Sequence, residues 1–244
     1  MIKTTIICAV WSKDPHRAAL LEQHQNNLDL LSVKTQRIYI FENNDTPPNF
    51  LKGSILVCNH PLTIYEAWNL AIPLVRTPFL MNLNLDDRLY IDAVEKLEHE
   101  IESTKSYLIG GDWNVTYSQI DTNNITNCFE SNLLPFDNRW PLNEGVITRL
   151  GSGTGERGTY GPSTLWRIEC HAKIPRFPYR TQDGRLLNVV GDSVFWGLLQ
   201  NHFKLKLARL PLVIGNYHHH PTEQAEFRHD DEWVYLNNGG VSFI

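Results

Sequence analysis

Two adjacent carboxylates, Asp86 and Asp87, follow a short apolar run in the segment Phe79–Leu89 ("FLMNLNLDDRL"). Neighbouring carboxylates repel each other, so water, an arginine such as Arg88, or a bound cation must compensate their charge. A purely structural explanation is an Asx turn that leads into the next helix. Which group compensates the pair decides what chemistry this segment can support.

A histidine run and a third acid add to the groups that could do chemistry. The run Tyr217–Pro221 ("YHHHP") follows a predicted strand, and in an extended chain only His218 and His220 point to the same side. These two could bind one metal or phosphate, and a solvated turn is the alternative. Asp192 stands at the start of a predicted helix, where capping is the usual explanation.

The elements that position these groups alternate between strands and helices in the first part of the chain. Three β-rich runs end in polar segments: Thr4–Trp11, Arg37–Phe41 and Ser54–Cys58. Apolar residues at helical spacing predict helices at Pro15–Leu31, Thr63–Val75 and Tyr90–Ser103. This alternation predicts an α/β domain with a mostly parallel sheet flanked by helices. Because ligands bind beyond the carboxyl ends of such strands, we expect Asn43–Asp45, Asn59–His60 and Asp86–Asp87 to converge there.

The second half of the sequence is less regular. Tyr107–Ile120 predicts one or two strands, Leu165–Ile174 a short helix, Val189–Phe203 a stronger helix and Leu205–Gly215 an edge strand. The glycine-rich segment Gly151–Pro162 lacks the lysine and the preceding strand of a P-loop. We interpret it as a mobile lid over a site, with a plain solvent loop as the alternative.

Composition restricts the classes of function. With 244 residues, 42% of them hydrophobic, the chain can bury the core of one α/β domain. A net charge of -5 without any basic run argues against a nucleic-acid partner. The four cysteines are widely spaced, which favours reduced thiols over a zinc site. Without a signal peptide or a transmembrane segment in the sequence, we expect a cytoplasmic protein, and peripheral membrane contact stays open.

Several short motifs occur in order along the chain: "FENNDT", "EAWNLA", "LNLDD", "WRIECHAKIPRF", "GDSVFW" and "LPLVIGNYHHHP". Together they resemble the motifs of nucleotide-sugar-dependent glycosyltransferases with the GT-A fold, most closely the inverting glycosyltransferase family 2. The resemblance covers nearly the whole chain. It implies a Rossmann-like sheet in which residues 1–106 form the nucleotide-sugar-binding half and residues 107–244 the acceptor-binding and catalytic half of a single domain.

The resemblance implies a donor site for a nucleotide-diphosphate sugar, with UDP favoured by analogy. The implied donor-binding residues are Val10, Glu42, Asn69, Asn84 and Asp86. Glu42 has the position of the acid that contacts the base, and Asp86 the last position of the DxD motif that holds Mn²⁺ or Mg²⁺. Asn84 replaces the first acid of that motif, and its amide can bond a ribose hydroxyl but adds no charge. His220 matches a family histidine and would add a metal contact.

The same resemblance assigns the catalytic and acceptor side. Asp192 matches the family's catalytic carboxylate, the general base that takes the proton of the acceptor hydroxyl in an inverting displacement. Trp166, Arg167 and Trp196 would contact a glycan or glycolipid acceptor, the tryptophans by stacking on sugar faces, although a core position is their usual role. The implied activity is hexosyl transfer in polysaccharide biosynthesis.

Two alternatives remain at this stage. A sugar nucleotidyltransferase also places acids at the strand ends of a parallel sheet, but its glycine-rich N-terminal loop is missing from "VWSKDPHR". A catalytically silent carbohydrate-binding protein on the same fold would explain the amide at Asn84.

Overall fold

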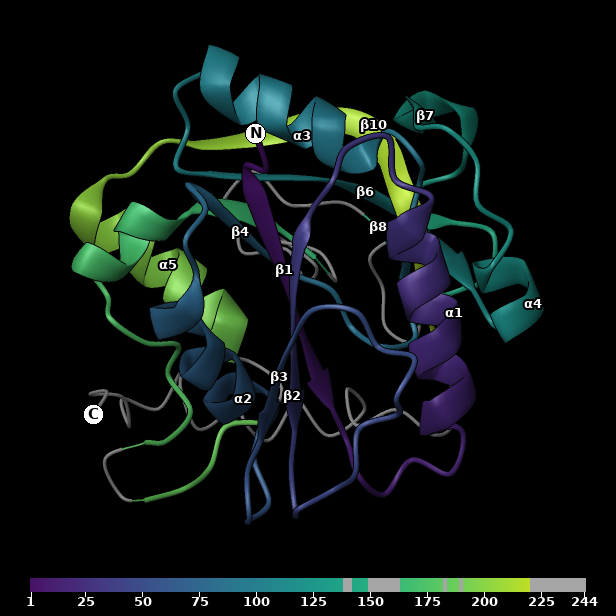
Figure 1. The fold of residues 1–244 in the computed structure, drawn as a ribbon. Helices are drawn as coiled ribbons and strands as arrows, with labels where there is room; N and C mark the ends of the chain where they lie inside the picture. Colours follow the sequence, from purple (N-terminus) through teal and green to yellow (C-terminus); the bar gives the residue numbers. More distant parts are fainter. Residues whose placement is uncertain (138–141, 149–162, 182–183, 189–190, 220–244) are drawn as a thin grey trace.

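The computed structural model describes residues 1–137, 142–148, 163–181, 184–188 and 191–219. These residues form one ten-stranded sheet with helices on both faces (Figure 1). The strand order is β3-β2-β1-β4-β9-β6-β10-β5, with β7 beside β10 and β8 beside β6. The predicted α/β class with a mostly parallel central sheet is confirmed.

The first part of the chain builds the parallel end of this sheet. Its strands are β1 (Thr4–Val10), β2 (Gln36–Phe41), β3 (Ser54–Val57) and β4 (Phe79–Asn82), all paired in parallel. Its helices are α1 (Arg17–Asp29), α2 (Ile64–Ala71) and the 3₁₀ turn η1 (Ile72–Leu74). The predicted segments therefore contain these elements to within one residue.

The rest of the chain adds strands to the same sheet. These elements are β5 (Arg88–Leu89), α3 (Ala93–Ser103), β6 (Leu108–Thr116), α4 (Gln119–Thr122), β7 (Phe129–Glu130), η2 (Ser131–Leu133), β8 (Ile147–Thr148), β9 (Leu165–Arg167), η3 (Ile168–Ala172), α5 (Gly191–Phe203) and β10 (Leu207–His218). Strand β9 runs antiparallel between β4 and β6 and joins the parallel end to the β6–β10 pair, which is parallel again.

Two predictions for the second half are wrong. Only part of Leu165–Ile174 is helical, because its first three residues form β9 before the 3₁₀ turn η3. Leu205–Gly215 does not form an edge strand, because β10 lies between β6 and β5. Its proline lacks the N–H that a strand ladder needs, and the β10 register shifts around Pro211. The glycine-rich segment Gly151–Pro162 lies outside the described residues.

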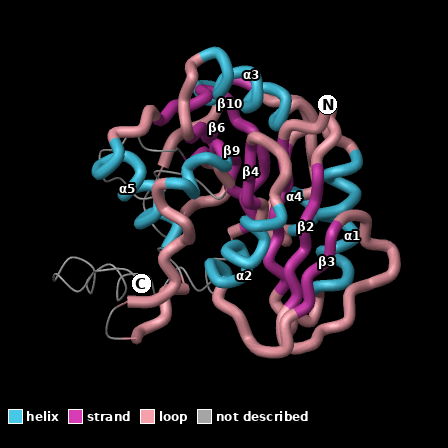
Figure 2. Tube along the Cα trace, turned by 60° about the vertical axis from the view of Figure 1, so that its left-hand side comes forward, coloured by secondary structure: helices cyan, strands magenta, loops and turns pink. Residues whose placement is uncertain are grey.

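Alternating residues of the central strands pack into separate cores on the two faces. On β1, Ile6 belongs to a core with α3, and Ile7 to a core with α2 and α5. A third cluster that includes Cys8 and Leu21 packs α1 against the sheet. Figure 2 shows α2 and α5 on one side of the central strands and α1 on the other. The four cysteines are free thiols, as expected. None of the helices in the described ranges has the length and apolar character needed to cross a bilayer.

Candidate active site

Glu42 ties together three segments at the carboxyl edge of the parallel strands, toward which β1 points in Figure 1. Its Oε1 accepts hydrogen bonds from the backbone N–H of Ser12 at 3.1 Å and from the Ser12 hydroxyl at 3.0 Å. Its Oε2 accepts one from the backbone N–H of Leu62 at 2.8 Å. Both oxygens of this buried carboxylate therefore bond the protein itself. Ser12 and Leu62 carry no sequence signal for this role, and the base contact of Glu42 stays a prediction.

The turn after Glu42 brings the expected segments together. Asn43 and Asn44 both adopt left-handed backbone conformations, with φ values of 54° and 55°. Their N–H groups donate to the carbonyls of His60 and Cys58 at 3.2 and 2.8 Å. Left-handed non-glycine residues are uncommon and often mark functional turns. The predicted convergence of the turns after β2 and β3 is confirmed.

The acidic turn between β4 and β5 presents one carboxylate outward. The Asp87 N–H donates to the Asn84 carbonyl at 3.3 Å, and the side chains alternate, so that Asn84 and Asp86 are partly exposed while Leu85 and Asp87 are buried. Desolvation by the surrounding protein raises the pKa of Asp86 to about 6. The negative charge of Asp14, in the loop after β1, adds to this rise in the pKa.

Arg88 holds the acidic turn from the protein interior. Its buried guanidinium donates to the carbonyls of Leu85 and Asp87 at 2.9 and 2.6 Å, and to side-chain oxygens of Asn123 and Gln23 at 2.7 and 3.0 Å. Burial lowers the pKa of Arg88, and the negative charges of Asp86 and Asp87 oppose that shift. Arg88 was predicted as a possible counter-ion for the acidic pair. Its hydrogen bonds to the backbone on both sides of Asp86 could not be predicted from the sequence.

The histidine run reaches the same turn. The backbone N–H of His218 donates to the Asp87 carboxylate at 3.0 Å, and its ring Nδ1 lies 3.4 Å from the Thr122 hydroxyl. His218 is partly exposed and His219 is buried, as expected for neighbours that point to opposite sides. His220 lies outside the described residues, so its metal contact stays a prediction.

Asp192 lies in the first turn of α5, and Tyr65 of α2 holds its side chain. Its Oδ1 accepts hydrogen bonds from the Ser193 N–H at 2.7 Å and from the buried Tyr65 hydroxyl at 3.2 Å. The neighbouring Gly191 packs closely on this contact, because a Cβ there would lie 2.7 Å from the Tyr65 ring and 2.3 Å from the Pro178 carbonyl oxygen. Tyr65 was missed by the sequence analysis, since a lone tyrosine in an amphipathic helix usually indicates core packing.

The residues at the start of α2 therefore connect Glu42 to Asp192. The Leu62 N–H bonds Glu42, and three residues later the Tyr65 hydroxyl bonds Asp192. Between these contacts, Thr63 and Glu66 form a reciprocal capping box with distances of 2.8 and 3.2 Å, which fixes the start of the helix.

Three sequence-predicted acceptor residues need correction. Trp166 and Trp196 are 0% and 1% exposed, so neither indole can stack on a sugar. Their ring centroids lie 5.0 Å apart in an aromatic core that includes Phe177. The Trp166 Nε1–H donates to His171 Nε2 at 3.0 Å. These indoles build the core beneath α5 instead of an acceptor groove.

Arg167 points away from the candidate site. It pairs in register with Phe79, at the opening residue of β4, whereas Asp86 follows the far end of that strand. Its guanidinium donates to the carbonyls of Ser106 and Ile101 at 2.7 and 3.2 Å, and so binds the end of α3. Its assignment as an acceptor residue is therefore wrong.

Two donor-site predictions acquire structural explanations. The Asn69 amide forms paired hydrogen bonds with the backbone of Phe177, donating at 2.9 Å and accepting at 2.7 Å. Val10 is the buried last residue of β1, so only its backbone lies at the edge. Their contacts with a donor stay predictions.

The oxygen atoms of the acidic turn suit a hard divalent cation. Asn84 and Asp86 supply an amide and a carboxylate, the ligand types that Mg²⁺ and Mn²⁺ accept. Over the described ranges, no three acids, histidines or cysteines form a ready metal site. The turn fits a cation that completes its coordination shell with ligand oxygens.

Solved structures share this arrangement of sheet and helices. TarS from S. aureus (residues 1–349), solved with UDP-GlcNAc, has a TM-score of 0.59 at 10% identity over 96% of this chain and 66% of that chain. The mannosyltransferase PcManGT from Pyrobaculum calidifontis, solved with GDP-Man and Mn²⁺, has a TM-score of 0.57 at 10% identity over 96% and 61% of the chains. CMP:2-keto-3-deoxy-manno-octonic acid synthetase, solved with CTP, has a TM-score of 0.50 at 9% identity over 97% and 99%.

These likenesses show the fold alone, because the sequence identities are low. The chain has the GT-A fold seen in nucleotide-sugar glycosyltransferases. It spans 58% of TarS 1–349 in the complex with UDP. No family model and no curated protein matches the sequence.

Proposed function

We propose that this protein is a glycosyltransferase that moves a sugar from a nucleotide diphosphate, with UDP the first choice, to a hydroxyl of a glycan or glycolipid. The observation that supports it best is the link between Glu42 and Asp192 through Leu62 and Tyr65 at the start of α2, at the strand edge where such folds bind nucleotides. The neighbours solved with UDP-GlcNAc and GDP-Man support the nucleotide-sugar class. We expect the protein to act in the cytoplasm.

In this proposal, residues 1–106 bind the donor and residues 107–244 the acceptor. The acceptor oxygen forms a bond to the anomeric carbon as the bond to the diphosphate breaks, and the configuration inverts. Asp192 receives the hydroxyl proton. The helix start stabilises its carboxylate form, so its contribution comes chiefly from proximity and orientation, which Tyr65 and Ser193 provide.

The acidic turn would hold Mn²⁺ or Mg²⁺ through Asp86, with Asn84 beside it. When bound, the cation would neutralise the charge of the departing diphosphate. Because the turn offers one outward carboxylate and Arg88 lies behind it, we expect weak binding of the cation alone and much tighter binding with a nucleoside diphosphate.

The test is sugar transfer or donor hydrolysis with a panel of UDP- and GDP-sugars and Mn²⁺. Wild type should turn over at least one donor, and Asp192→Asn should lose turnover but keep donor binding. Asp86→Ala should lose the Mn²⁺-dependent part of UDP or GDP binding. Tight nucleotide binding without turnover of any donor, unchanged in Asp192→Asn, would instead support the catalytically silent carbohydrate-binding protein.

A sugar nucleotidyltransferase is the second candidate. It is favoured by the synthetase solved with CTP, of which this chain covers 99%. It is disfavoured by the loop after β1, where Val10–Arg17 contains no glycine to cradle a triphosphate. Release of pyrophosphate from CTP or UTP with a sugar phosphate would identify this activity, whereas the glycosyltransferase releases a nucleoside diphosphate.

A further inference from the structure

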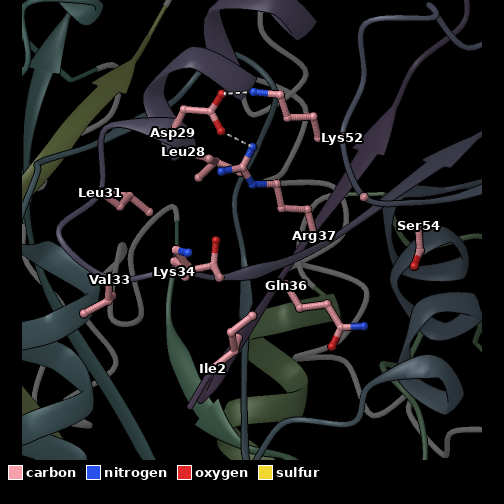
Figure 3. Close-up of a pocket in the computed structure, with 12 residues that line it drawn as sticks. Ile2, Leu28, Asp29, Leu31, Val33, Lys34, Gln36, Arg37, Lys52 and Ser54 are labelled. Atoms are coloured by element: carbon pink, nitrogen blue, oxygen red, sulfur yellow. Dashed lines mark hydrogen bonds and ion pairs between the residues drawn. The ribbon is translucent and has the colours of Figure 1, made fainter.

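A cavity of about 640 Å³ lies at the amino edge of the parallel strands (Figure 3). It is lined by Ile2, the end of α1, the segment from Leu31 to Arg37, and the turn from Lys52 to Ser54. Strands β2 and β3 begin in this lining, whereas Glu42 follows the opposite end of β2. The cavity is therefore separate from the candidate active site, and its volume is in the range of small-molecule sites.

The cavity carries an excess of positive charge. Lys34, Arg37 and Lys52 line it together with a single acid, Asp29. Asp29 forms ion pairs with both Arg37 and Lys52, each at 2.7 Å, as Figure 3 shows. Across the described part of the chain, no carboxylate pairs with Lys34. The lining therefore has a formal charge of +2.

The cavity also has an apolar wall and a fixed shape. Leu31 and Val33 lie on one side of it in Figure 3, across from Arg37 and Ser54. Gly53, with a φ of 129°, brings its turn so close to β2 that a Cβ would lie 2.7 Å from the Arg37 carbonyl oxygen. Only glycine therefore allows this turn to form the side of the cavity.

We propose that this cavity binds a phosphate monoester with an apolar substituent. The phosphate dianion matches the formal charge of +2, and its oxygens can accept hydrogen bonds from Lys34. The apolar substituent lies against Leu31 and Val33. Such a group occurs in soluble phosphate esters and in lipid headgroups, and the proposal does not depend on the glycosyltransferase activity.

The test is calorimetric titration of the full chain with hexyl phosphate, in EDTA so that no divalent cation assists binding elsewhere. Wild type should bind saturably, and methyl phosphate and hexanol should each bind more weakly. Lys34→Met should weaken binding about tenfold through the lost charge. Lys96→Met, which removes the same charge from the exposed face of α3, should leave binding unchanged.

Vesicles of phosphatidylcholine with or without phosphatidic acid identify the source of the phosphate. Binding that needs phosphatidic acid and is lost in Lys34→Met assigns the cavity to a lipid headgroup, and binding of hexyl phosphate alone assigns it to a soluble ester. The proposal is overturned if neither probe binds, or if Lys34→Met binds like wild type. Loss of binding in Asp86→Ala would also overturn it, because the phosphate would then occupy the candidate active site.

Discussion

Removal of one hydroxyl, in Tyr65→Phe, tests whether Asp192 is held in place for catalysis. The Tyr65 ring is 2% exposed and packs on Trp68 and Phe177, with centroid distances of 5.4 and 6.3 Å. Phenylalanine keeps these ring contacts and removes the hydroxyl that donates to Asp192 at 3.2 Å. The variant should therefore fold like wild type and leave the carboxylate with fewer restraints.

The expected size of the effect follows from that hydrogen bond. Hydrogen bonds to charged groups contribute about 1.5–3 kcal/mol, and a distance of 3.2 Å favours the lower end. A loss of about 1.4 kcal/mol in the transition state lowers kcat about tenfold. The KM for the donor should not change, because the hydrogen bond that is lost goes to Asp192 and not to the predicted donor-binding residues Glu42 and Asp86.

The assay is steady-state transfer with the best donor, with Tyr90→Phe as the matched control. Tyr90 is equally buried, and its hydroxyl donates to Asn216 at 2.9 Å, so its loss repeats the chemical change far from Asp192. The control should keep the wild-type kcat. The reasoning is refuted if both variants lose kcat equally, or if Tyr65→Phe raises KM and leaves kcat unchanged.

Three further predictions concern stability. Glu42→Gln should lower the free energy of unfolding in urea titrations by about 1–3 kcal/mol, because the amide N–H₂ of glutamine would face the N–H donor of either Ser12 or Leu62. An unchanged urea midpoint would contradict this. Gly191→Ala should cost about 1–3 kcal/mol and lower turnover, because its Cβ would overlap Tyr65 and the Pro178 carbonyl; a melting temperature like that of wild type would show that the contact is loose. Burial lowers the pKa of His171 from 6.5 to about 4, so the unfolded state binds a proton more readily than the folded state. The free energy of unfolding is therefore at its full value above pH 6.5 and falls by about 3 kcal/mol as the pH is lowered to 4. Urea unfolding of His171→Gln should show less loss over that pH range, and an equal loss would exclude this histidine as the cause.

Much of the fold was predictable because the first strands are short apolar runs with clear polar ends. Strand β9 was not, since three residues are too few to show a period, and its neighbours β4 and β6 are what make it a strand. Strand β10 was predicted as an edge strand, the position where a proline such as Pro211 is usually found, but a register shift accommodates the missing N–H within the sheet.

From the sequence, residues could be assigned to the candidate site only where a charged or polar side chain lies in one of the ordered motifs. The motifs indicated Asp86 and Asp192, but not which partners hold them, because Tyr65 and Arg88 act through contacts with distant segments or with backbone carbonyls. The tryptophans show the opposite error. Trp166 and Phe177 stand in one motif and Trp196 in another, and only their packing shows that the two indoles belong to the core.

The start of α2 has a consequence for how donor preference and catalysis can vary in the proposed enzyme. Leu62 and Tyr65 stand on either side of the N-cap Thr63, and the capping box fixes their spacing, which therefore does not depend on the lengths of the surrounding loops. Substitutions in the turn from Asn43 to Asp45 could therefore change which nucleotide is accepted without moving Asp192. Nucleotide choice and proton transfer would then be separately adjustable traits of one small scaffold.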